Sequence, residues 1–493
     1  MLRRYRTHLF LALVAFACAQ GWNRWNIQAM LHDPMTAQQV SAGGSVMAVD
    51  DASYLQAVDA LLGDRPDLVN TALPARPDLR APGYRLWYLL PRLFFPPTTS
   101  VRLLVLFQCM LYALAVALLW ETLRMHDIAP LIRWTLCLLF VVMPTFHGFL
   151  FHTLTEGVTP ALSLAVLCGS LIAYTTRSTK WLVFAAVIWA LLVFTRPALV
   201  WVGAAVIPTA WLLWRSFPRV AFMVVLVLAP TAIWWVRNSI MSGEPVGLHP
   251  VYRTDEPGIN RPVHGAFWDL AKSWGARGDQ FHGVIEPAFR AAMVCDTSSV
   301  YAAQFIQLAP SGSLTAQQEA ELRDAFHRWQ RFNCTELAPA LIGADRTLKH
   351  TSPTEQEIER ALERITSEWR GSHLLHHHAF VPLHVLRDLV AHSNLNLILF
   401  QRTLRGKPLM ELLRWCSAIL HISMMIAVLL AALLRVPSPL RWCAWGACAY
   451  IGYLAYVQRG VEERYTLPVL VIAVVCAAFV LQRFVRPNFA AKT

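Results

Sequence analysis

The chain has 493 residues, of which 56% are hydrophobic and 15% are charged, and its formal net charge is +12 at pH 7. About a quarter of the residues of a soluble domain are charged, so this composition excludes an ordinary soluble protein and indicates several membrane-spanning helices. The sequence has no zinc-finger spacing and no RNA-binding signature, and basic residues in the loops of a membrane protein keep those loops cytoplasmic. We therefore expect an all-α polytopic membrane protein that contacts membrane lipid and has no nucleic-acid partner.

Apolar runs of membrane-spanning length predict about ten transmembrane helices. They cover residues 8–25, 101–121, 128–146, 157–175, 180–195, 197–214, 219–236, 409–434, 440–457 and 465–483. The first run follows a basic start and ends in small residues, as a signal peptide does, so cleavage after Ala19 is an alternative to the retained helix that we prefer. The runs 180–195 and 197–214 are short and meet at the sequence TRP, so they are alternatively one broken element.

Basic residues in the connecting loops orient these spans. With a cytoplasmic N-terminus, every predicted cytoplasmic loop contains arginine or lysine, as the positive-inside rule requires. Both termini are then cytoplasmic, a bacterial inner membrane is the expected location, and the loops with unusual polar motifs are extracytoplasmic. The predicted domains are an N-terminal transmembrane module with a catalytic first external loop (1–236), an extracytoplasmic, mainly helical domain (237–408) and C-terminal transmembrane helices (409–493).

The first external loop contains two adjacent carboxylates, Asp50 and Asp51, ahead of a short amphipathic helix whose apolar stripe begins at Tyr54. One acid at this position caps the helix and interacts favourably with its dipole, so a structural role requires only one of the two. Adjacent carboxylates repel each other, which favours protonation of one and suits a general base or a metal site. These residues alone leave the structural and the chemical interpretation open.

Further motifs lie on the same predicted face. They contain Arg80 in LRAPGYRLWYLL, His152 and Glu156 in HGFLFHTLTE, Arg196 in TRP, Arg237 in WWVRN, and Glu463, Arg464 and Tyr465 in VEERYTLP. Each arginine alone is interpreted as a membrane-edge anchor. Because the positive-inside rule disfavours arginine on this face, several of them together indicate an anionic ligand, and phosphate suits a guanidinium group.

A metal site is a minority alternative among these motifs. His147, His152 and Glu156 offer donors for zinc, but their spacing matches no zinc motif, so a divalent metal has no clear ligand set. The histidine-rich sequence HLLHHH, residues 373–378, lacks nearby carboxylates and is interpreted as a surface segment.

The long polar segment predicts a small, mostly helical extramembrane domain. Capping boxes, Thr315 with Gln318 and Ser352 with Glu355, precede amphipathic stripes in this segment. Cys295 and Cys334 also lie in it, and they are candidates for a disulfide if the segment faces an oxidising compartment.

Together the motifs resemble those of the GT-C glycosyltransferases, specifically the branch of protein O-mannosyltransferases and aminoarabinose transferases. The first external loop is similar to the acid motif of that family, with Asp50 at the acid position, Asp51 where glutamate is usual, and Tyr54 at the tyrosine position. Five further landmarks follow in family order: LRAPGYRLWYLL, HTLTEG, TRP, WWVRN and ERYTLPVL. The likeness covers residues 1–250 and 409–485, but Leu79 replaces a metal-binding glutamate of the family, which argues against a metal of that type.

The resemblance implies a GT-C-type bundle with external surface helices. It also implies transfer of a sugar, with inversion, from a polyprenyl-phosphate donor to a hydroxyl of a glycan, lipid or protein. The expected catalytic residues are Asp50 as base and Asp51 as cap or helper. Arg80, Arg237, Arg464, Tyr465 and, more weakly, Arg196 are expected to bind the donor phosphate, and Tyr54, His152, Glu156 and Glu463 to position substrate. The alternatives are a transporter or flippase, a polymerase or ligase for lipid-linked glycans, and a non-catalytic scaffold.

Overall fold

The computed structural model describes most of the chain. The described residues are 2–47, 54–55, 58–59, 61–63, 81–242, 261–339, 352–393, 395, 405–460 and 462–486. Asp50, Asp51 and Arg80 lie outside these ranges. Within them the chain is mainly helical, and β-type pairing is limited to isolated bridges that pair Val46 with Val40 and with His152.

The chain divides into two compact units. Unit 1 comprises Met1–Pro250, Val390–Tyr450 and Glu463–Thr493, and unit 2 comprises Val251–Leu389 and Ile451–Glu462. Unit 2 is therefore narrower than the predicted segment 237–408, and it also includes Ile451–Glu462, which runs from the end of the predicted span 440–457 into the loop after it.

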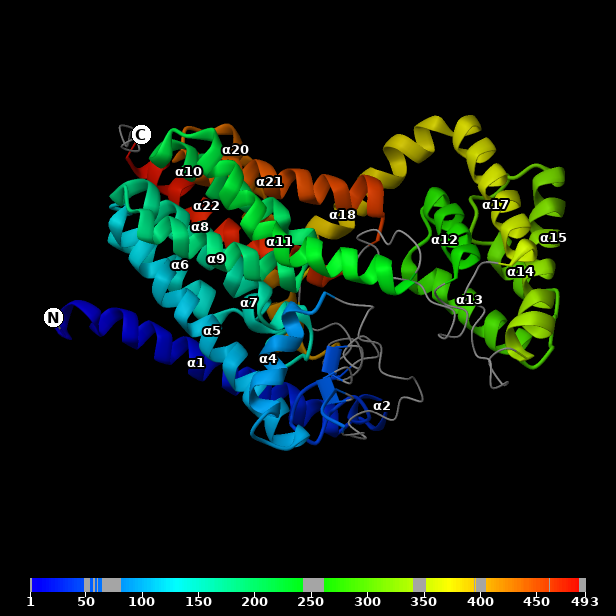
Figure 1. The fold of residues 1–493 in the computed structure, drawn as a ribbon, viewed down its shortest axis with the longest axis horizontal. Coiled ribbons are helices and arrows are strands. Elements are labelled where there is room, and N and C mark those ends of the chain that lie inside the picture. The colour runs from blue at the N-terminus through cyan, green and yellow to red at the C-terminus, as the bar shows by residue number, and fades with distance from the viewer. Residues whose placement is uncertain are drawn as a thin grey trace. The chain divides into compact units, whose positions relative to one another are not determined.

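Unit 1 is a helical bundle (Figure 1). Its elements are α1 (Leu2–Leu31), α2 (Pro34–Ala37), α4 (Gly83–Arg92), α5 (Pro97–Met125), α6 (Pro130–Val142), α7 (Pro144–His147), η1 (Thr155–Gly157), α8 (Thr159–Thr176), α9 (Thr179–Thr195), η2 (Pro197–Ala204), α10 (Val206–Trp214), α11 (Phe217–Ser242), α20 (Pro408–Leu433), α21 (Ser438–Tyr453, which extends into unit 2), η7 (Glu463–Thr466) and α22 (Leu467–Val485). Helices α8 and α22 are buried along most of their length and form the centre of the bundle. Helices α5 and α9 pack against α8, and α20 packs against α22.

Five helices in the described residues are long and apolar enough to cross a membrane, so the chain is an all-α membrane protein. They are Pro97–Met125, Thr159–Thr176, Phe217–Ile240, Pro408–Leu433 and Arg464–Val485. The pair η2 and α10, bent by 42°, makes a sixth span if the two form one element. The prediction of about ten spans is therefore wrong for the part of the chain that the structure describes.

The overcount has a physical reason. Helix α6 has 13 residues, fewer than the hydrocarbon core requires, and α9 has 17, at the lower limit of spanning length. Helix α21 has 16 residues before it passes into the π-helix η6 (Leu454–Gln458). Helix α1 joins its apolar run to a basic start and to the polar stretch QGWNRWNIQ. Because sidedness follows from the number of spans, cytoplasmic termini and an extracytoplasmic site stay predictions.

Unit 2 contains helices packed around an aromatic core. Its elements are α12 (Pro262–Trp274), α13 (Gly278–Met293), α14 (Val300–Ile306), α15 (Ala316–Phe332), η3 (Asn333–Leu337), α17 (Pro353–Ser372), η4 (His376–Phe380), α18 (Val381–Val390, whose last residue lies in unit 1) and η6. Phe267 lies edge-on to Phe305, Phe326 and Trp329 in this core. The burial of these aromatic rings gives the unit a hydrophobic core of its own.

The capping boxes and the disulfide predicted for this region are present in unit 2. Both predicted capping boxes are formed, at the start of α15 and at the start of α17. Glu355 of the second box also makes a buried ion pair with Arg261, which joins the starts of α17 and α12. Cys295 and Cys334 form a disulfide with a Cα–Cα distance of 4.9 Å, which links the end of α13 to η3.

Candidate functional site

Three of the predicted motifs meet at Glu156 in unit 1. This residue lies in η1, just before α8, and it is 4% exposed. Its Oε1 atom lies 2.5 Å from Nη1 of Arg196 and 3.8 Å from Nε of Arg464. The hydroxyl of Thr155 donates a hydrogen bond to Oε2 over 3.1 Å. Side chains from HTLTEG, TRP and ERYTLP therefore converge on one buried carboxylate.

Helix ends position these charged residues. Arg196 follows the last residue of α9 in an extended conformation, with φ at −146°, because Pro197 disfavours helical backbone in the residue before it. Arg464 lies in η7, and Pro468 stands at the beginning of the next helix, α22. A charge at the end of a spanning helix costs less than a charge in its middle, so these positions suit arginines that must remain ionised.

Electrostatics keep Glu156 ionised. Burial by itself raises the pKa of this carboxyl group, but attraction to Arg196 and Arg464 outweighs burial and lowers the pKa from 4.5 to about 2. One carboxylate thus faces two guanidinium groups. The Arg196 guanidinium also lies 5.2 Å from the centre of the Tyr465 ring, a cation–π contact that fixes its orientation.

His152 contributes no charge to this cluster at neutral pH. Burial lowers the pKa of its imidazole, and the positive charge of Arg464 acts in the same direction, so the pKa falls to about 3. A neutral imidazole offers one donor and one acceptor, which suits hydrogen bonding to a substrate hydroxyl.

A buried amide, Gln108 of α5, holds the His152 loop in place. Its Nε2 atom donates to the carbonyl oxygens of Leu150 over 2.8 Å and of His152 over 3.1 Å, while its Oε1 accepts from the Tyr84 hydroxyl over 2.9 Å. Gly157 packs directly on this amide, since a Cβ atom there would lie 2.0 Å from Oε1 of Gln108. Gln108 was not among the predicted site residues, although a lone amide inside an apolar span is a signal for such a role.

The chain on both sides of the acid pair is anchored near this loop. Before the pair, the Val46 amide donates to the carbonyl of Phe151 over 2.9 Å, next to His152. After the pair, the Tyr54 ring lies edge-on to Tyr84, with 5.3 Å between ring centroids. The arrangement therefore links the flanks of the first-loop acid motif to the elements that carry His152 and Gln108.

A second buried ion pair fixes the helical segment that follows Tyr54. Asp59 is fully buried, and its Oδ1 lies 2.6 Å from Nε of Arg92 on α4. The Tyr88 hydroxyl donates to the same carboxylate over 3.2 Å. The sequence analysis did not identify this pair, because Asp59 lies inside an otherwise amphipathic stripe and looks like a solvent-facing residue.

The remaining predicted residues are distributed differently. Arg237, near the end of α11, donates to Oδ1 of Asn238 over 2.8 Å and lies 4.5 Å from the Trp234 ring centroid. Its contacts within the described residues do not include the Glu156 cluster. Glu463 opens η7, but its side chain is outside what the structure describes. Among the described residues, no group of three or more His, Cys, Asp or Glu side chains is arranged to bind a metal ion.

Comparisons of the chain with protein-family models, with curated proteins and with solved structures found no match. The likeness to GT-C glycosyltransferases thus rests on the sequence motifs. The geometry adds a separate observation, which is that residues about 270 positions apart in the chain, Arg196 and Arg464, contact the same carboxylate.

Proposed function

We propose that the chain is a membrane glycosyltransferase. It moves a sugar from a polyprenyl-phosphate donor to a hydroxyl group of a glycan, lipid or protein acceptor on the extracytoplasmic face. The observation that carries this proposal is the convergence of Arg196 and Arg464 on Glu156, beside His152. Guanidinium groups on rigid helix ends are suited to holding a phosphate group.

The reaction needs a base and a stabilised leaving group. Asp50 removes the proton from the acceptor hydroxyl, and the hydroxyl oxygen attacks the anomeric carbon from the side opposite the phosphate. The bond from that carbon to the phosphate oxygen breaks, and polyprenyl phosphate leaves with the bonding electron pair. The leaving phosphate gains negative charge, so arginines stabilise the transition state more than the bound donor. Attack from the opposite side inverts the anomeric carbon.

Glu156 is a positioning residue in this scheme. It holds the two guanidinium groups in one place through a buried carboxylate, while 15% of the Arg196 side chain and 20% of the Arg464 side chain stay exposed. We expect the donor phosphate to approach the exposed part of the Arg196 side chain. Preorganised charge of this kind needs little rearrangement during the reaction.

A flippase for a lipid-phosphate substrate is the second candidate. The observation that favours it is the 42° bend between α10 and η2, the element that begins directly after Arg196, because broken helices are typical of transporter binding sites. A flippase would bind the same phosphate group and would move the lipid without breaking the glycosidic bond.

One experiment separates the two functions. The protein is reconstituted in liposomes with polyprenyl-phosphate sugars labelled in the sugar, and a pool of envelope glycans, lipids and proteins serves as acceptor. We expect label to enter the acceptor pool with the wild type, and about 100-fold slower transfer with Asp50→Asn. The matched control is Asp279→Asn, an exposed acid on α13, which is expected to transfer at the wild-type rate. Equal transfer by the Asp50→Asn and wild-type proteins refutes the assigned base, and lipid movement without transfer favours the flippase.

A further inference from the structure

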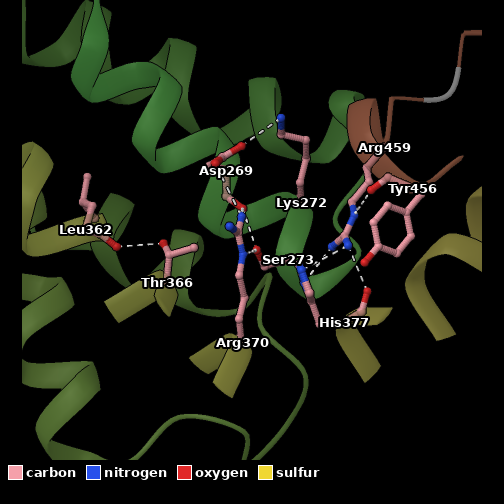
Figure 2. Close-up of polar contacts among 9 residues, drawn as sticks. All are labelled: Asp269, Lys272, Ser273, Leu362, Thr366, Arg370, His377, Tyr456 and Arg459. Atoms are coloured by element: carbon pink, nitrogen blue, oxygen red, sulfur yellow. Dashed lines mark hydrogen bonds and ion pairs between the residues drawn. The ribbon is translucent and has the colours of Figure 1, made fainter. Parts of the chain in front are cut away.

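Unit 2 contains a second basic cluster, and we propose that it binds the phosphate headgroup of an anionic glycerophospholipid of the bilayer. The cluster consists of Lys272 from α12, Arg370 from α17, His377 from η4, and Tyr456 and Arg459 from the segment at η6 (Figure 2). This site is separate from the Glu156 cluster of unit 1, and the proposal does not depend on the proposed function.

Arg459 is the key residue of this cluster, because its guanidinium group is buried among neutral partners. It is 7% exposed. Its Nε donates to the carbonyl of Tyr456 over 2.9 Å, and its Nη2 donates to the carbonyl of His377 over 3.0 Å. Among the described residues, no carboxylate lies within ion-pair distance of its guanidinium group. A buried charge without a counter-ion is costly, so an anionic ligand accounts for an arginine at this position.

The imidazole of His377 does not accept hydrogen bonds from all the remaining N–H groups of the Arg459 guanidinium. Its two ring nitrogens lie 2.7 Å and 3.1 Å from Nη1 and Nη2 of Arg459. Burial and the charge of Arg459 lower the pKa of His377 to about 4, so the ring is neutral at pH 7 and only one of its nitrogens accepts. One guanidinium N–H thus lacks an acceptor in the ring and remains for a ligand oxygen.

The backbone at Arg459 is also unusual. Its φ is 51°, in the left-handed region that glycine adopts without strain, although Gly460 follows directly. Arg459 is the C-cap of η6 in this conformation, which ends the element and places its side chain beside His377.

The other charges around Arg459 leave the cluster positive. Arg370 Nη2 lies 3.4 Å from Oδ2 of Asp269, and Lys272 Nζ lies 3.1 Å from Oδ1 of the same residue. Asp269 is the one carboxylate facing three cations in this cluster, which leaves two net positive charges within the described residues. Figure 2 shows Arg370 and Arg459 approaching from two sides, with Ser273 and His377 between them.

Exposed groups give a ligand access to the cluster. The Arg370 side chain is 36% exposed, and Tyr456, whose hydroxyl contacts Nδ1 of His378 over 2.6 Å, is also exposed. The segment HLLHHH lies at the surface as predicted, with Leu374, Leu375 and His378 exposed, except that the π-helical turn η4 buries His377. A phosphate oxygen is thus able to approach Arg370 and the accessible edge of Arg459 together.

Neighbouring apolar side chains indicate a lipid rather than a soluble anion. Large apolar residues in and beside η4 and η6 are also more than half exposed: Leu374 and Leu375 before η4, Phe380 in η4, Leu383 in the following α18, and Val457 in η6. Apolar side chains beside cations are typical of segments that lie in the interface of a membrane with anionic lipids. The candidate span Arg464–Val485 begins five residues after Arg459 in the sequence.

The test uses the full-length protein in lipid-free micelles. Phosphatidylglycerol is titrated into it, and native mass spectrometry measures the bound fraction. We expect Arg370→Gln and Arg459→Gln each to weaken binding about tenfold, the loss of one charge-assisted hydrogen bond. The control, Arg290→Gln, changes the same charge on α13 at a side chain that is 80% exposed, and it is expected to bind like the wild type. Thermal unfolding of each variant without lipid reports whether it is folded.

Each alternative result has a defined meaning. Wild-type affinity in Arg370→Gln overturns the proposal, and this variant decides if Arg459→Gln fails to fold. Equal losses in Arg290→Gln and Arg370→Gln also overturn it, because they indicate a general charge effect. Inorganic phosphate that displaces phosphatidylglycerol at an equal concentration overturns the assignment to lipid. Phosphatidylcholine that binds as tightly as phosphatidylglycerol overturns the preference for an anionic headgroup. None of these results changes with the outcome of the glycosyl-transfer assay.

Discussion

Replacement of Glu156 by glutamine tests the central ion-pair cluster of unit 1. Glutamine keeps the size and one acceptor oxygen of the side chain, but it removes the charge that both arginines face. The pKa of Glu156 falls from 4.5 to about 2 on folding, and this difference corresponds to about 3 kcal/mol. Removal of one partner from a buried ion pair costs about 3–5 kcal/mol, which agrees with the free energy that corresponds to the pKa difference. We expect Glu156→Gln to lower the free energy of unfolding by about 3 kcal/mol at pH 7.

The pH dependence gives this prediction its specificity. Because folding lowers the pKa, the contribution of Glu156 is fully present above pH 4.5 and is lost as the pH falls toward 2. The difference in stability between wild type and Glu156→Gln should therefore be largest at pH 7 and should shrink between pH 4.5 and the lowest pH at which the protein is folded. Denaturant titration in mixed micelles at pH 7, 4 and 3 measures it.

A matched control and a clear contrary result complete the test. Glu319→Gln removes the same charge from an exposed position on α15 and is expected to change stability by less than about 0.5 kcal/mol. A Glu156→Gln protein as stable as this control at pH 7 would contradict the buried ion pair. A stability difference that is equal at pH 7 and pH 3 would show that the charge of Glu156 is not its source.

Three further predictions concern other parts of the structure. Gly157→Ala should lower the free energy of unfolding by about 1–3 kcal/mol, because its Cβ would overlap Gln108. The control Gly371→Ala, whose Cβ would lie in open space on α17, should leave stability unchanged. Equal stability of the two variants in thermal unfolding would argue against the close contact. Asp59→Asn should cost about 3 kcal/mol because it removes the charge of a fully buried carboxylate that pairs with Arg92, and a loss below about 1 kcal/mol in denaturant titration would contradict the burial of this pair. Cys334→Ser should destabilise unit 2 by about 2–4 kcal/mol, and the wild type should approach the variant in thermal stability after reduction; an unchanged melting temperature in the variant would contradict this.

Features that depend on residues close together in the sequence could be predicted for this chain. The capping boxes at Thr315 and Ser352 depend on residues three positions apart, so their pattern is visible without a fold. The arginines of TRP and ERYTLP stand out because each lies at the end of an apolar run, Arg196 directly before Pro197 and Arg464 four residues before Pro468. Their grouping with Glu156 could be expected from the order of the spans, but the contacts could not.

Ion pairs between residues that are far apart in the chain could not be predicted from the sequence. Nothing near Asp59 or Arg92 in the chain distinguishes a fully buried pair from two solvated charges, because burial depends on the packing of a whole helix. The number of spans was overestimated for a related reason. Hydropathy measures the length of an apolar run, whereas helix length is also limited by turns such as the one between α6 and α7.

The division of unit 2 into two chain segments has a consequence for biosynthesis. Residues 251–389 leave the ribosome well before 451–462, and the membrane helix α20 is made between them. Cys295 and Cys334 both lie in the early segment, so their disulfide can form during synthesis. His377 must wait for Arg459, since the later segment supplies that partner. Until the later segment is made, unit 2 is incomplete and the apolar side chains around η4 remain unpacked. We expect the nascent chain to bind chaperones or to aggregate most readily during this interval.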